Sequence, residues 1–361
     1  MSRVAVLAAG GTGGHLFPAQ ALAETLTARG WRVVLATDAR GAQYAHDFPA
    51  EERLALDAAT ASNPVQMIGA VFKIMAGVAQ ARSAFARLKP SVVVGFGGYP
   101  SVPALLAAAT SGRPIVIHEQ NAVLGRSNRA LARFARKIAA AFPTLERVPA
   151  ALRDRIEVVG NPVRADIRAL QDRTFDATQD RLHVLITGGS QGARVLSETA
   201  PRALAQIAER LRDRLHVHQQ TRPELLDSAR DTYADAAIQA EVAPFFRDMA
   251  TRLGQAHLVI GRAGASTCSE LAVAGLPSVL VPLKIATDDH QRLNAKSLAD
   301  AGAAMIILED DLTVDRLAEA VQAMLDDPAA LNRRAQAART VGIPDAAERL
   351  ADLVEAQASR V

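Results

Sequence analysis

Short apolar runs alternate with longer segments of helical periodicity along the whole chain. The runs are rich in valine, isoleucine and leucine and show no apolar–polar alternation, which is typical of strands buried on both faces. Expected strands cover residues 3–9, 32–37, 91–96, 114–118, 137–141, 182–187, 215–219, 257–260, 277–281 and 303–308. Expected helices cover residues 18–29, 64–88, 102–111, 126–135, 246–254, 265–273, 290–301, 313–326 and 328–339, with another long helix after 193. This order predicts parallel sheets covered by helices on both faces.

The same order of elements begins in each half of the chain, because each half opens with a strand, a glycine-rich loop and a helix. The stretch Val158–Arg164 separates the halves, since Pro162 biases the residue before it toward an extended conformation. Residues 165–181 are polar and charged and are expected to form the linker. The predicted fold class is therefore α/β, with two doubly wound parallel-sheet domains that face a central cleft.

Length, charge and cysteine content indicate the number of domains, the charge of the ligand and the cellular compartment. A length of 361 residues suits two domains, and the net charge of +3 fits an anionic ligand or an anionic membrane surface. The single cysteine, Cys268, excludes an intrachain disulfide and fits a reducing compartment. No apolar run reaches the ~20 residues of a membrane span, and the N-terminal run is shorter than the ~7–15 residues of a signal peptide core. The chain is therefore expected to stay in the cytoplasm.

Three polar loops of the first half follow expected strands: Gly10–His15, Gly95–Tyr99 and His118–Asn121. In an open parallel sheet, ligands bind outside the carboxyl ends of the strands, so the three loops are expected to converge. Glycines also let a ligand approach the backbone N–H groups and the N-terminus of the next helix, which together attract anions. The loops predict a binding site for a phosphorylated ligand.

The first glycine loop lacks the dinucleotide fingerprint, because Leu16 stands where G-x-G-x-x-G requires its third glycine. A nicotinamide-dependent oxidoreductase stays as an alternative, with Asp38 at the end of the second strand in the place of a ribose ligand. The motif G-x-x-x-x-G-K-[ST] is absent, which excludes a P-loop enzyme.

The second half contains two more loops of small residues between a strand and a helix, Gly188–Ala193 and Gly261–Thr267. Each predicts an anion site at a helix N-terminus. Asp288, Asp289 and His290 stand close together, but they precede an expected helix, where aspartates cap the first turn and complement the dipole. We therefore expect no metal and no cofactor.

The expected helix 64–88 is apolar over more of its surface than one core-facing stripe requires. Its apolar residues are Met67, Ile68, Val71, Phe72, Ile74, Met75 and Val78, and the basic residues among or after them are Lys73, Arg82, Arg87 and Lys89. Two interpretations stay open. The helix lies on an anionic bilayer, or it is buried against a neighbouring loop.

Seven ordered motifs resemble those of the MurG family, and the resemblance covers nearly the whole chain. The motifs are Gly10–His15, Gly95–Tyr99, His118–Asn121, Gly160–Arg164, Gly188–Ala193, Gly264–Glu270 and His290–Ala295. MurG enzymes are bacterial transferases that add N-acetylglucosamine from UDP-N-acetylglucosamine to undecaprenyl-pyrophosphoryl-MurNAc-pentapeptide (lipid I). The resemblance implies these two substrates, an anionic membrane surface as a further partner, and a location at the cytoplasmic face of the inner membrane. A nucleic-acid partner is not expected.

The resemblance also implies a GT-B fold and a division of labour. Residues 1–162 would form the acceptor-side and membrane-side domain, with the C-terminal helix 343–361 packing back onto it. Residues 163–342 would bind UDP-N-acetylglucosamine. One departure concerns the loop after His218–Gln219, where the family has small residues and a glycine. Here Gln220-Thr221-Arg222-Pro223 follows, and no role is assigned to that loop.

Site roles carry over where residues match the family motifs. The resemblance implies that the diphosphate is bound by Ser190, Ala265, Ser266 and Thr267. It implies that Glu270 binds the ribose, the backbone of Phe246 binds uracil, Gln291 binds the sugar hydroxyls and Arg164 binds the nucleotide. The N-acetylglucosamine would be contacted by Thr12, Gly13, Gly14 and Asn121. The acceptor side would comprise Tyr99 and Glu119, and Gly97 and Gly98 would face the acceptor pyrophosphate together with the first glycine loop.

The implied reaction is an inverting transfer to the C4 hydroxyl of MurNAc, with UDP as the leaving group. One side chain must accept the hydroxyl proton, and the candidates are His15 and Glu119. A helix N-terminus disfavours a positive charge, so a neutral imidazole at His15 is expected there. Alternatives from other classes are a UDP-N-acetylglucosamine 2-epimerase, which would need no acceptor, and a two-domain binding protein.

Overall fold

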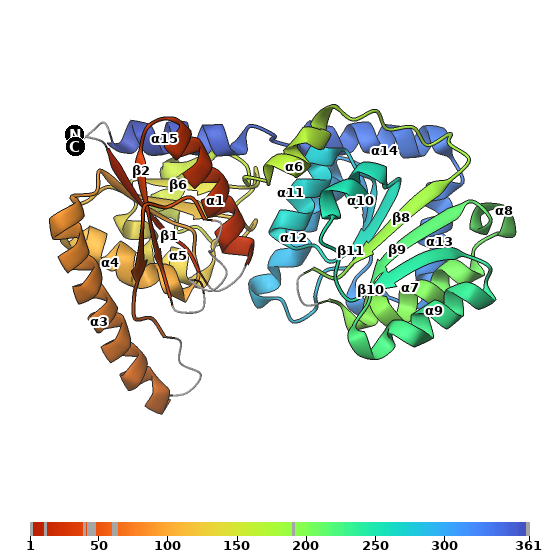
Figure 1. The fold of residues 1–361 in the computed structure, drawn as a ribbon, viewed down its shortest axis with the longest axis horizontal. Helices are drawn as coiled ribbons and strands as arrows, with labels where there is room; N and C mark the ends of the chain where they lie inside the picture. The colour runs from red at the N-terminus through yellow and green to blue at the C-terminus, as the bar shows by residue number, and fades with distance from the viewer. Residues whose placement is uncertain are drawn as a thin grey trace. The chain divides into compact units, whose positions relative to one another are not determined.

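The computed structural model describes residues 3–10, 13–38, 41, 48–59, 64–189 and 192–358. The chain divides into two compact units (Figure 1). Unit 1 comprises Met1–Arg164 and Pro344–Val361, and unit 2 comprises Ala165–Ile343. Within the described ranges, no helix is long and apolar enough to cross a membrane.

Unit 1 is built on a seven-stranded sheet in the order β3-β2-β1-β4-β5-β6-β7. Its strands are β1 (Val4–Ala8), β2 (Arg32–Thr37), β3 (Glu52–Ala55), β4 (Val92–Gly95), β5 (Ile115–Glu119), β6 (Lys137–Ala140) and β7 (Ile156–Val158). All neighbours pair in parallel, and Val6 in the sheet centre pairs with Val34 on one side and Val93 on the other. The central strands are buried on both faces, as their uninterrupted apolar sequences predict.

Helices cover both faces of this sheet. They are α1 (Gly13–Ala28), α3 (Pro64–Leu88), α4 (Val102–Thr110), α5 (Arg126–Leu131) and α15 (Ala346–Ala358), with 3₁₀ turns at Tyr99–Ser101, Ala132–Phe134 and Ala150–Arg155. On one face, Phe85 of α3 and Leu105 of α4 belong to one buried apolar cluster. On the other, Leu22 of α1 and Val354 of α15 belong to a second. The sheet is therefore doubly wound.

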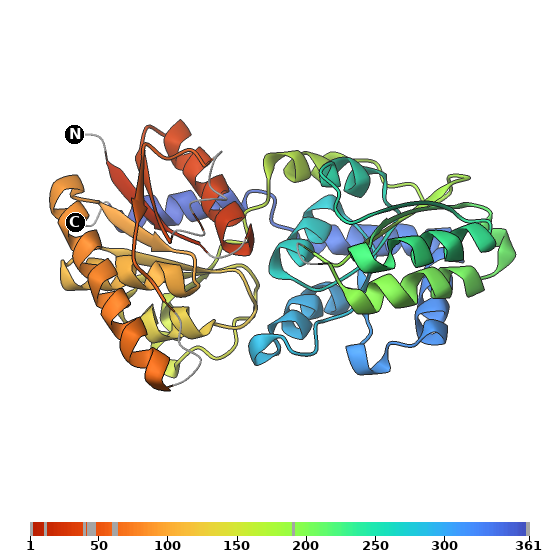
Figure 2. The same cartoon turned by 60° about the horizontal axis from the view of Figure 1, so that its bottom comes forward.

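The last helix of the chain, α15, lies beside the first one, α1 (Figure 2). Leu350 and Val354 of α15 are fully buried in this packing, and such apolar burial stabilises it. At its border, Arg29 donates to Asp352 at 2.6 Å, and the indole N–H of Trp31 donates to Glu355 at 2.7 Å. Residues more than 300 positions apart thus complete one core.

Unit 2 repeats the plan with a six-stranded parallel sheet in the order β10-β9-β8-β11-β12-β13. Its strands are β8 (Leu182–Thr187), β9 (Leu215–Gln220), β10 (Gln239–Ala243), β11 (Leu258–Gly261), β12 (Ser278–Leu280) and β13 (Ala304–Ile306). Its helices are α6 (Ala165–Arg168), α7 (Arg194–Gln206), α8 (Glu209–Arg212), α9 (Leu226–Asp235), α10 (Met249–Gln255), α11 (Ala265–Ala274), α12 (His290–Asp300), α13 (Val314–Leu325) and α14 (Pro328–Val341), with 3₁₀ turns at Ala169–Asp172, Pro223–Leu225, Thr287–Asp289 and Glu309–Asp311. The predicted α/β class with two parallel sheets is confirmed.

Three of the strands were not expected: β3, β7 and β10. Each lies at the edge of its sheet, where one side of the strand faces solvent. Their sequences therefore carry charged residues and lack the apolar run that marks a central strand.

Two other expectations were wrong in position. Helix α1 begins at Gly13, five residues before the expected start, and Pro18 lies inside it. Proline has no N–H for the carbonyl four residues earlier, so the carbonyl of Gly14 lacks its intrahelical donor. Residues 165–181, expected to form the linker, belong to unit 2, because Ile167 of α6 is fully buried and Arg173 donates to the carbonyls of Leu253 and Gly254.

Candidate functional site

The three polar loops of unit 1 meet at the carboxyl edge of its sheet, since β1, β4 and β5 are neighbours. His15, in the first turn of α1, places its Nδ1 2.9 Å from the Oε1 of Gln120, which follows β5. A Cβ built on Gly98, after β4, would lie 3.5 Å from the Nε2 of His15. Gly97 and Gly98 have φ of 86° and 71°, which side chains disfavour, so bare backbone faces the imidazole. The predicted convergence of the loops is confirmed.

Hydrogen bonds around Gln120 define the tautomer of His15. The Nε2 of Gln120 lies 3.1 Å from the carbonyl oxygen of His118 and 2.9 Å from the Nδ1 of that side chain. A carbonyl can only accept, so the amide nitrogen faces His118 and the amide oxygen faces His15. That oxygen also only accepts, so the proton of the His15 ring is on Nδ1. In the neutral ring, the lone pair is therefore on the Nε2 of His15, beside Gly98.

His118 is the third member of a hydrogen-bonded relay that runs from His15 through Gln120 to His118, and it is the buried end of that relay. Its Nε2 donates to the carbonyl of Gly160 at 3.0 Å, which leaves its Nδ1 to accept from Gln120. Complete burial lowers the pKa of His118 to about 4, and the neighbouring His15 contributes in the same direction. His118 is therefore neutral near pH 7, as the relay requires. Sequence reasoning assigned no role to His118 or Gln120, although both stand in the His118–Asn121 motif.

Glu119 points the other way and organises the loop after β5. Its side chain is 2% exposed. One carboxylate oxygen accepts from the backbone and side-chain nitrogens of Asn121 at 3.1 and 3.2 Å. The other accepts from the backbone N–H of Gly125 at 2.9 Å and from the Nδ2 of Asn128 at 2.8 Å. Glu119 and Asn121 lie together, and both are used to hold this loop.

Tyr99 is bound to the end of a neighbouring strand. Its hydroxyl donates to the Oδ2 of Asp38 at 2.7 Å, and the Oδ1 of Asp38 accepts from the backbone of Gly41 at 2.9 Å. Asp38 is buried. The aspartate that a nicotinamide enzyme would direct toward a ribose thus contacts protein groups, which disfavours the oxidoreductase alternative.

Other unit 1 candidates lie near this edge. Gly13 and Gly14 form the first turn of α1, and Thr12 lies outside the described residues. Arg164 is the last residue of the first segment of unit 1, and its guanidinium carbon lies 5.8 Å from the ring centroid of Phe17 on α1.

In unit 2, the glycine loop after β8 is built tightly. A Cβ on Gly188 would lie 2.1 Å from the backbone nitrogen of Ala193, so only glycine fits there. Gly189 and Gly192 have φ of 78° and 69°. Ser190 lies outside the described residues. The loop returns on itself through a hydrogen bond from the N–H of Gly192 to the carbonyl of Gly189.

The N-terminus of α11 lies at the same edge, because β11 pairs with β8. Ala265, Ser266 and Thr267 are its first three residues, and the N-cap, Gly264, has no side chain that could accept from their amides. Such a helix start is a ready anion site. Glu270 lies further along the same helix.

Two further donor candidates have defined surroundings. The ring of Phe246 is buried beneath Arg252, whose guanidinium carbon lies 3.8 Å from the ring centroid, and this suits a residue expected to act through its backbone. The Oε1 of Gln291, at the start of α12, accepts from the backbone N–H of Leu283 at 3.0 Å.

Four histidines to which the sequence gave no role gather around His183 of β8, two of them on β9 and one just before β11. They are His183, His216, His218 and His257, and the other three rings lie 5.2–5.8 Å from that of His183. Burial lowers the pKa of His183 to about 4 and also lowers the pKa of His218 and His257. Across the described residues, no group of three or more histidine, cysteine or acidic side chains is arranged to hold a metal ion.

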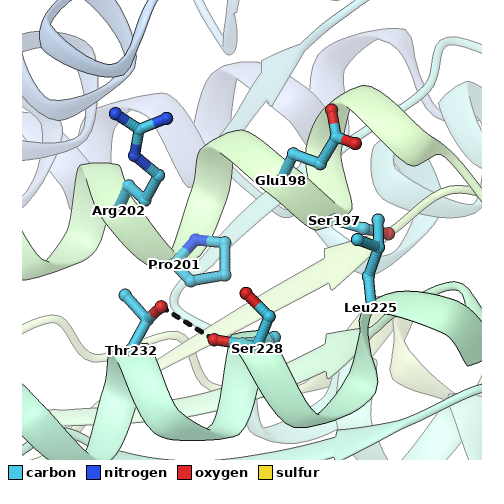
Figure 3. A pocket seen from close by; sticks show the side chains of 8 residues that line it. Ser197, Glu198, Pro201, Arg202, Leu225, Ser228 and Thr232 are labelled. Carbon is cyan, nitrogen blue, oxygen red and sulfur yellow. Dashed lines mark hydrogen bonds between the residues drawn. The ribbon is translucent and has the colours of Figure 1, made fainter.

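A separate groove runs between α7 and α9 of unit 2 (Figure 3). Its lining comprises Ser197, Glu198, Pro201, Arg202, Leu225, Ser228, Ala229 and Thr232. Figure 3 shows the hydroxyl of Thr232 donating to the carbonyl of Ser228 within α9, at 2.8 Å. None of the lining residues is a predicted site residue, so this groove does not coincide with the candidate site.

Known proteins resemble this chain over nearly its whole length. Residues 5–140 match the glycosyltransferase family 28 N-terminal domain, and residues 183–350 match the glycosyltransferase family 28 C-terminal domain. A protein of Caulobacter vibrioides named UDP-N-acetylglucosamine–N-acetylmuramyl-(pentapeptide) pyrophosphoryl-undecaprenol N-acetylglucosamine transferase is 61% identical over 98% of this chain and 99% of its own. A protein of Phenylobacterium zucineum with the same name is 59% identical over 98% of both chains. The crystal structure of Acinetobacter baumannii MurG is 34% identical over 98% of this chain and 99% of that one, with a TM-score of 0.82.

Proposed function

This chain belongs to the family of UDP-N-acetylglucosamine–N-acetylmuramyl-(pentapeptide) pyrophosphoryl-undecaprenol N-acetylglucosamine transferases, and we propose how its residues perform that transfer. It moves N-acetylglucosamine from UDP-N-acetylglucosamine to undecaprenyl-pyrophosphoryl-MurNAc-pentapeptide. The acceptor is the C4 hydroxyl of MurNAc, whose oxygen attacks the anomeric carbon with inversion. The bond from that carbon to the diphosphate oxygen breaks, and UDP leaves.

His15 is the general base that takes the hydroxyl proton. The observation that supports this role is the relay through Gln120 and His118, which leaves the Nε2 of His15 unprotonated beside Gly98. A base needs an available lone pair at the reacting hydroxyl, and this is the atom that has one. The proton that Nε2 accepts makes the ring cationic for the duration of the step.

Glu119 is the weaker candidate for the base. Both of its oxygens already accept hydrogen bonds from the loop after β5. A carboxylate that accepts several N–H bonds is stabilised in its charged form and is a correspondingly poor proton acceptor. Glu119 serves the site by holding Asn121, which contacts the N-acetylglucosamine together with Gly13 and Gly14.

Unit 2 holds the donor. The amides of Ala265, Ser266 and Thr267 at the start of α11 bind the diphosphate and stabilise the charge that grows on it as the anomeric bond breaks. The remaining contacts from unit 2 come from Ser190 of the glycine loop to the diphosphate, Glu270 to the ribose, the backbone of Phe246 to uracil and Gln291 to the sugar hydroxyls. Arg164, at the end of the first segment of unit 1, contacts the nucleotide. A metal ion is not required for these steps.

On the acceptor side, Gly97 and Gly98 face the pyrophosphate of the lipid together with the first glycine loop. Their positive φ angles and missing side chains expose backbone to an anion. Tyr99 lies beside them and is held by Asp38.

The function is tested by measuring UDP release from UDP-N-acetylglucosamine with and without a soluble analogue of the lipid acceptor. We expect release to depend on the acceptor and to yield the β-linked disaccharide. Consumption of the donor without acceptor, with the 2-epimer as the product, would instead identify an epimerase. Absence of turnover under both conditions would contradict the transferase assignment.

The enzyme docks on the anionic cytoplasmic face of the inner membrane through α3. Ile68, Val71, Phe72 and Met75 are 53–72% exposed and follow one another at the helical spacing that makes a stripe. Lys73 and Arg82 are exposed on the same helix, and Lys89 is exposed directly after its last residue, Leu88. Arg87 differs, because Glu52 pairs with it and compensates its charge. An apolar stripe beside cations is typical of helices that lie in a bilayer interface.

Vesicle sedimentation provides the test of this docking surface. The double change Phe72→Asp and Met75→Asp is expected to abolish binding to anionic vesicles, because it places two charges in the apolar stripe. The matched control, Ser83→Asp with Ala86→Asp, adds the same charge to exposed positions nearer the C-terminus of α3 and should weaken binding only partly. Equal binding by the wild type and the Phe72/Met75 variant would rule out α3 as the docking surface.

A further inference from the structure

Gln220 occupies a central position at the carboxyl edge of the unit 2 sheet. It is the last residue of β9, and β9 lies between β8 and β10. The glycine loop follows β8, and the Pro244–Phe246 segment follows β10. Gln220 is 5% exposed and lies between these two strand ends. The sequence alone gave this residue no role.

The amide of Gln220 uses both of its ends. Its Oε1 accepts from the hydroxyl of Thr187 at 3.0 Å and from the backbone N–H of Gly188 at 3.2 Å. Its Nε2 donates to the carbonyl of Gly189 at 2.9 Å and to that of Pro244 at 3.4 Å. A primary amide has two donor hydrogens and an oxygen that accepts twice, so these contacts use its full capacity.

Thr187 extends this contact by one more link. Its hydroxyl oxygen lies 3.3 Å from the N–H of Gly189, from which it accepts, while it donates to Gln220. Gly188 and Gly189 therefore bind the Gln220–Thr187 pair through both N–H groups and one carbonyl. A glycine loop has no side chains of its own to restrict it, and glycine loses more conformational freedom on ordering than other residues.

We infer that Gln220 is a positioning residue for the nucleotide, because it holds the start of the glycine loop, Gly188 and Gly189, and the start of the Pro244–Phe246 segment before the donor binds. A preorganised loop saves the ordering cost at the moment of binding, so the amide raises affinity without touching the ligand. The inference rests on the proposed function, in which these two segments hold the diphosphate and the uracil of UDP.

Calorimetric titration with UDP tests the inference. Gln220→Ala removes all four contacts, and we expect the Kd for UDP and the KM for UDP-N-acetylglucosamine to rise by about 10-fold or more, with kcat at saturating donor near the wild-type value. Gln220→Glu keeps the side-chain length and the two acceptor contacts but loses donation to Gly189 and Pro244. It is also expected to weaken UDP binding, and it keeps the test decisive if the alanine variant does not fold.

Tyr233→Phe is the matched control. The buried hydroxyl of Tyr233 donates to the Oε1 of Gln219, the residue before Gln220 on the same strand. Its removal deletes a buried hydrogen bond without affecting the glycine loop, so stability falls and UDP affinity stays constant. Wild-type UDP affinity in both Gln220 variants, or an equal loss in Tyr233→Phe, would overturn the inference. Failure of the wild-type protein to bind UDP would instead overturn the proposed donor site.

Discussion

Replacement of His15 by alanine is expected to lower kcat by about 10²–10⁴-fold, the range that general bases contribute. The variant loses the only atom of the relay that presents a lone pair to the acceptor hydroxyl, the Nε2 beside Gly98. His15 is not among the residues proposed to contact UDP, so the Kd for UDP should stay near the wild-type value. Initial rates at saturating donor and acceptor measure the effect, and titration with UDP provides the check on binding.

His15→Asn separates proton transfer from hydrogen bonding. An asparagine amide can still donate toward the Oε1 of Gln120, but it cannot act as a base near pH 7. We therefore expect His15→Asn to be as slow as His15→Ala. Wild-type kcat in the asparagine variant would show that His15 acts only as a hydrogen-bond partner of Gln120 and not as the base. Near-normal kcat in His15→Ala, together with a collapse in Glu119→Gln at unchanged stability, would assign the base to Glu119.

Replacement of Glu119 by alanine is expected to destabilise unit 1 by about 3 kcal/mol or more, since a buried donor left without an acceptor costs about 1–3 kcal/mol. Four donor groups lose the carboxylate in this variant, namely two nitrogens of Asn121, the N–H of Gly125 and the Nδ2 of Asn128, of which the last keeps only the carbonyl of His118 at 3.4 Å. Thermal and urea unfolding measure the loss. Activity falls with it, because the loop that carries Asn121 loses its order.

Glu119→Gln refines this test. One amide oxygen can still accept a pair of these bonds, but the amide nitrogen then faces two donors of the loop. We expect its stability to lie between those of the wild type and Glu119→Ala. A Glu119→Ala protein that unfolds at the wild-type temperature and is nevertheless inactive would contradict the loop-holding role, and would point to chemistry at the carboxylate.

The central strands and the loops after them could be predicted from sequence patterns, whereas one edge strand could not. The central strands were predictable because burial on both faces requires continuous apolar runs, as in Val92–Gly95. The loops after β1, β4 and β5 were predictable as one site because parallel strands bring their carboxyl ends to the same edge. The edge strand β10 escaped prediction, since its solvent-facing positions carry polar residues.

Assignment of roles within the predicted loops required the structure. Glu119 and Gln120 are adjacent in the sequence and equally polar, yet Glu119 holds its own loop while Gln120 orients His15. Neighbouring side chains on a strand end point to opposite sides, so only the packing decides which groups each one meets. The same holds for Gln219 and Gln220, of which one contacts Tyr233 and the other the glycine loop.

The sequence by itself determined the two parallel sheets, the set of glycine loops at their carboxyl edges, and the family, because these depend on local patterns of apolar residues, glycines and motif spacing. Only the tertiary structure decided which nitrogen of His15 carries the proton, that the Glu119 carboxylate is used by its own loop, and that Gln220 joins two strand ends. These features depend on hydrogen bonds between residues that are up to 105 positions apart in the chain. Their partners are chosen by the three-dimensional packing of the strands rather than by the order of residues along them.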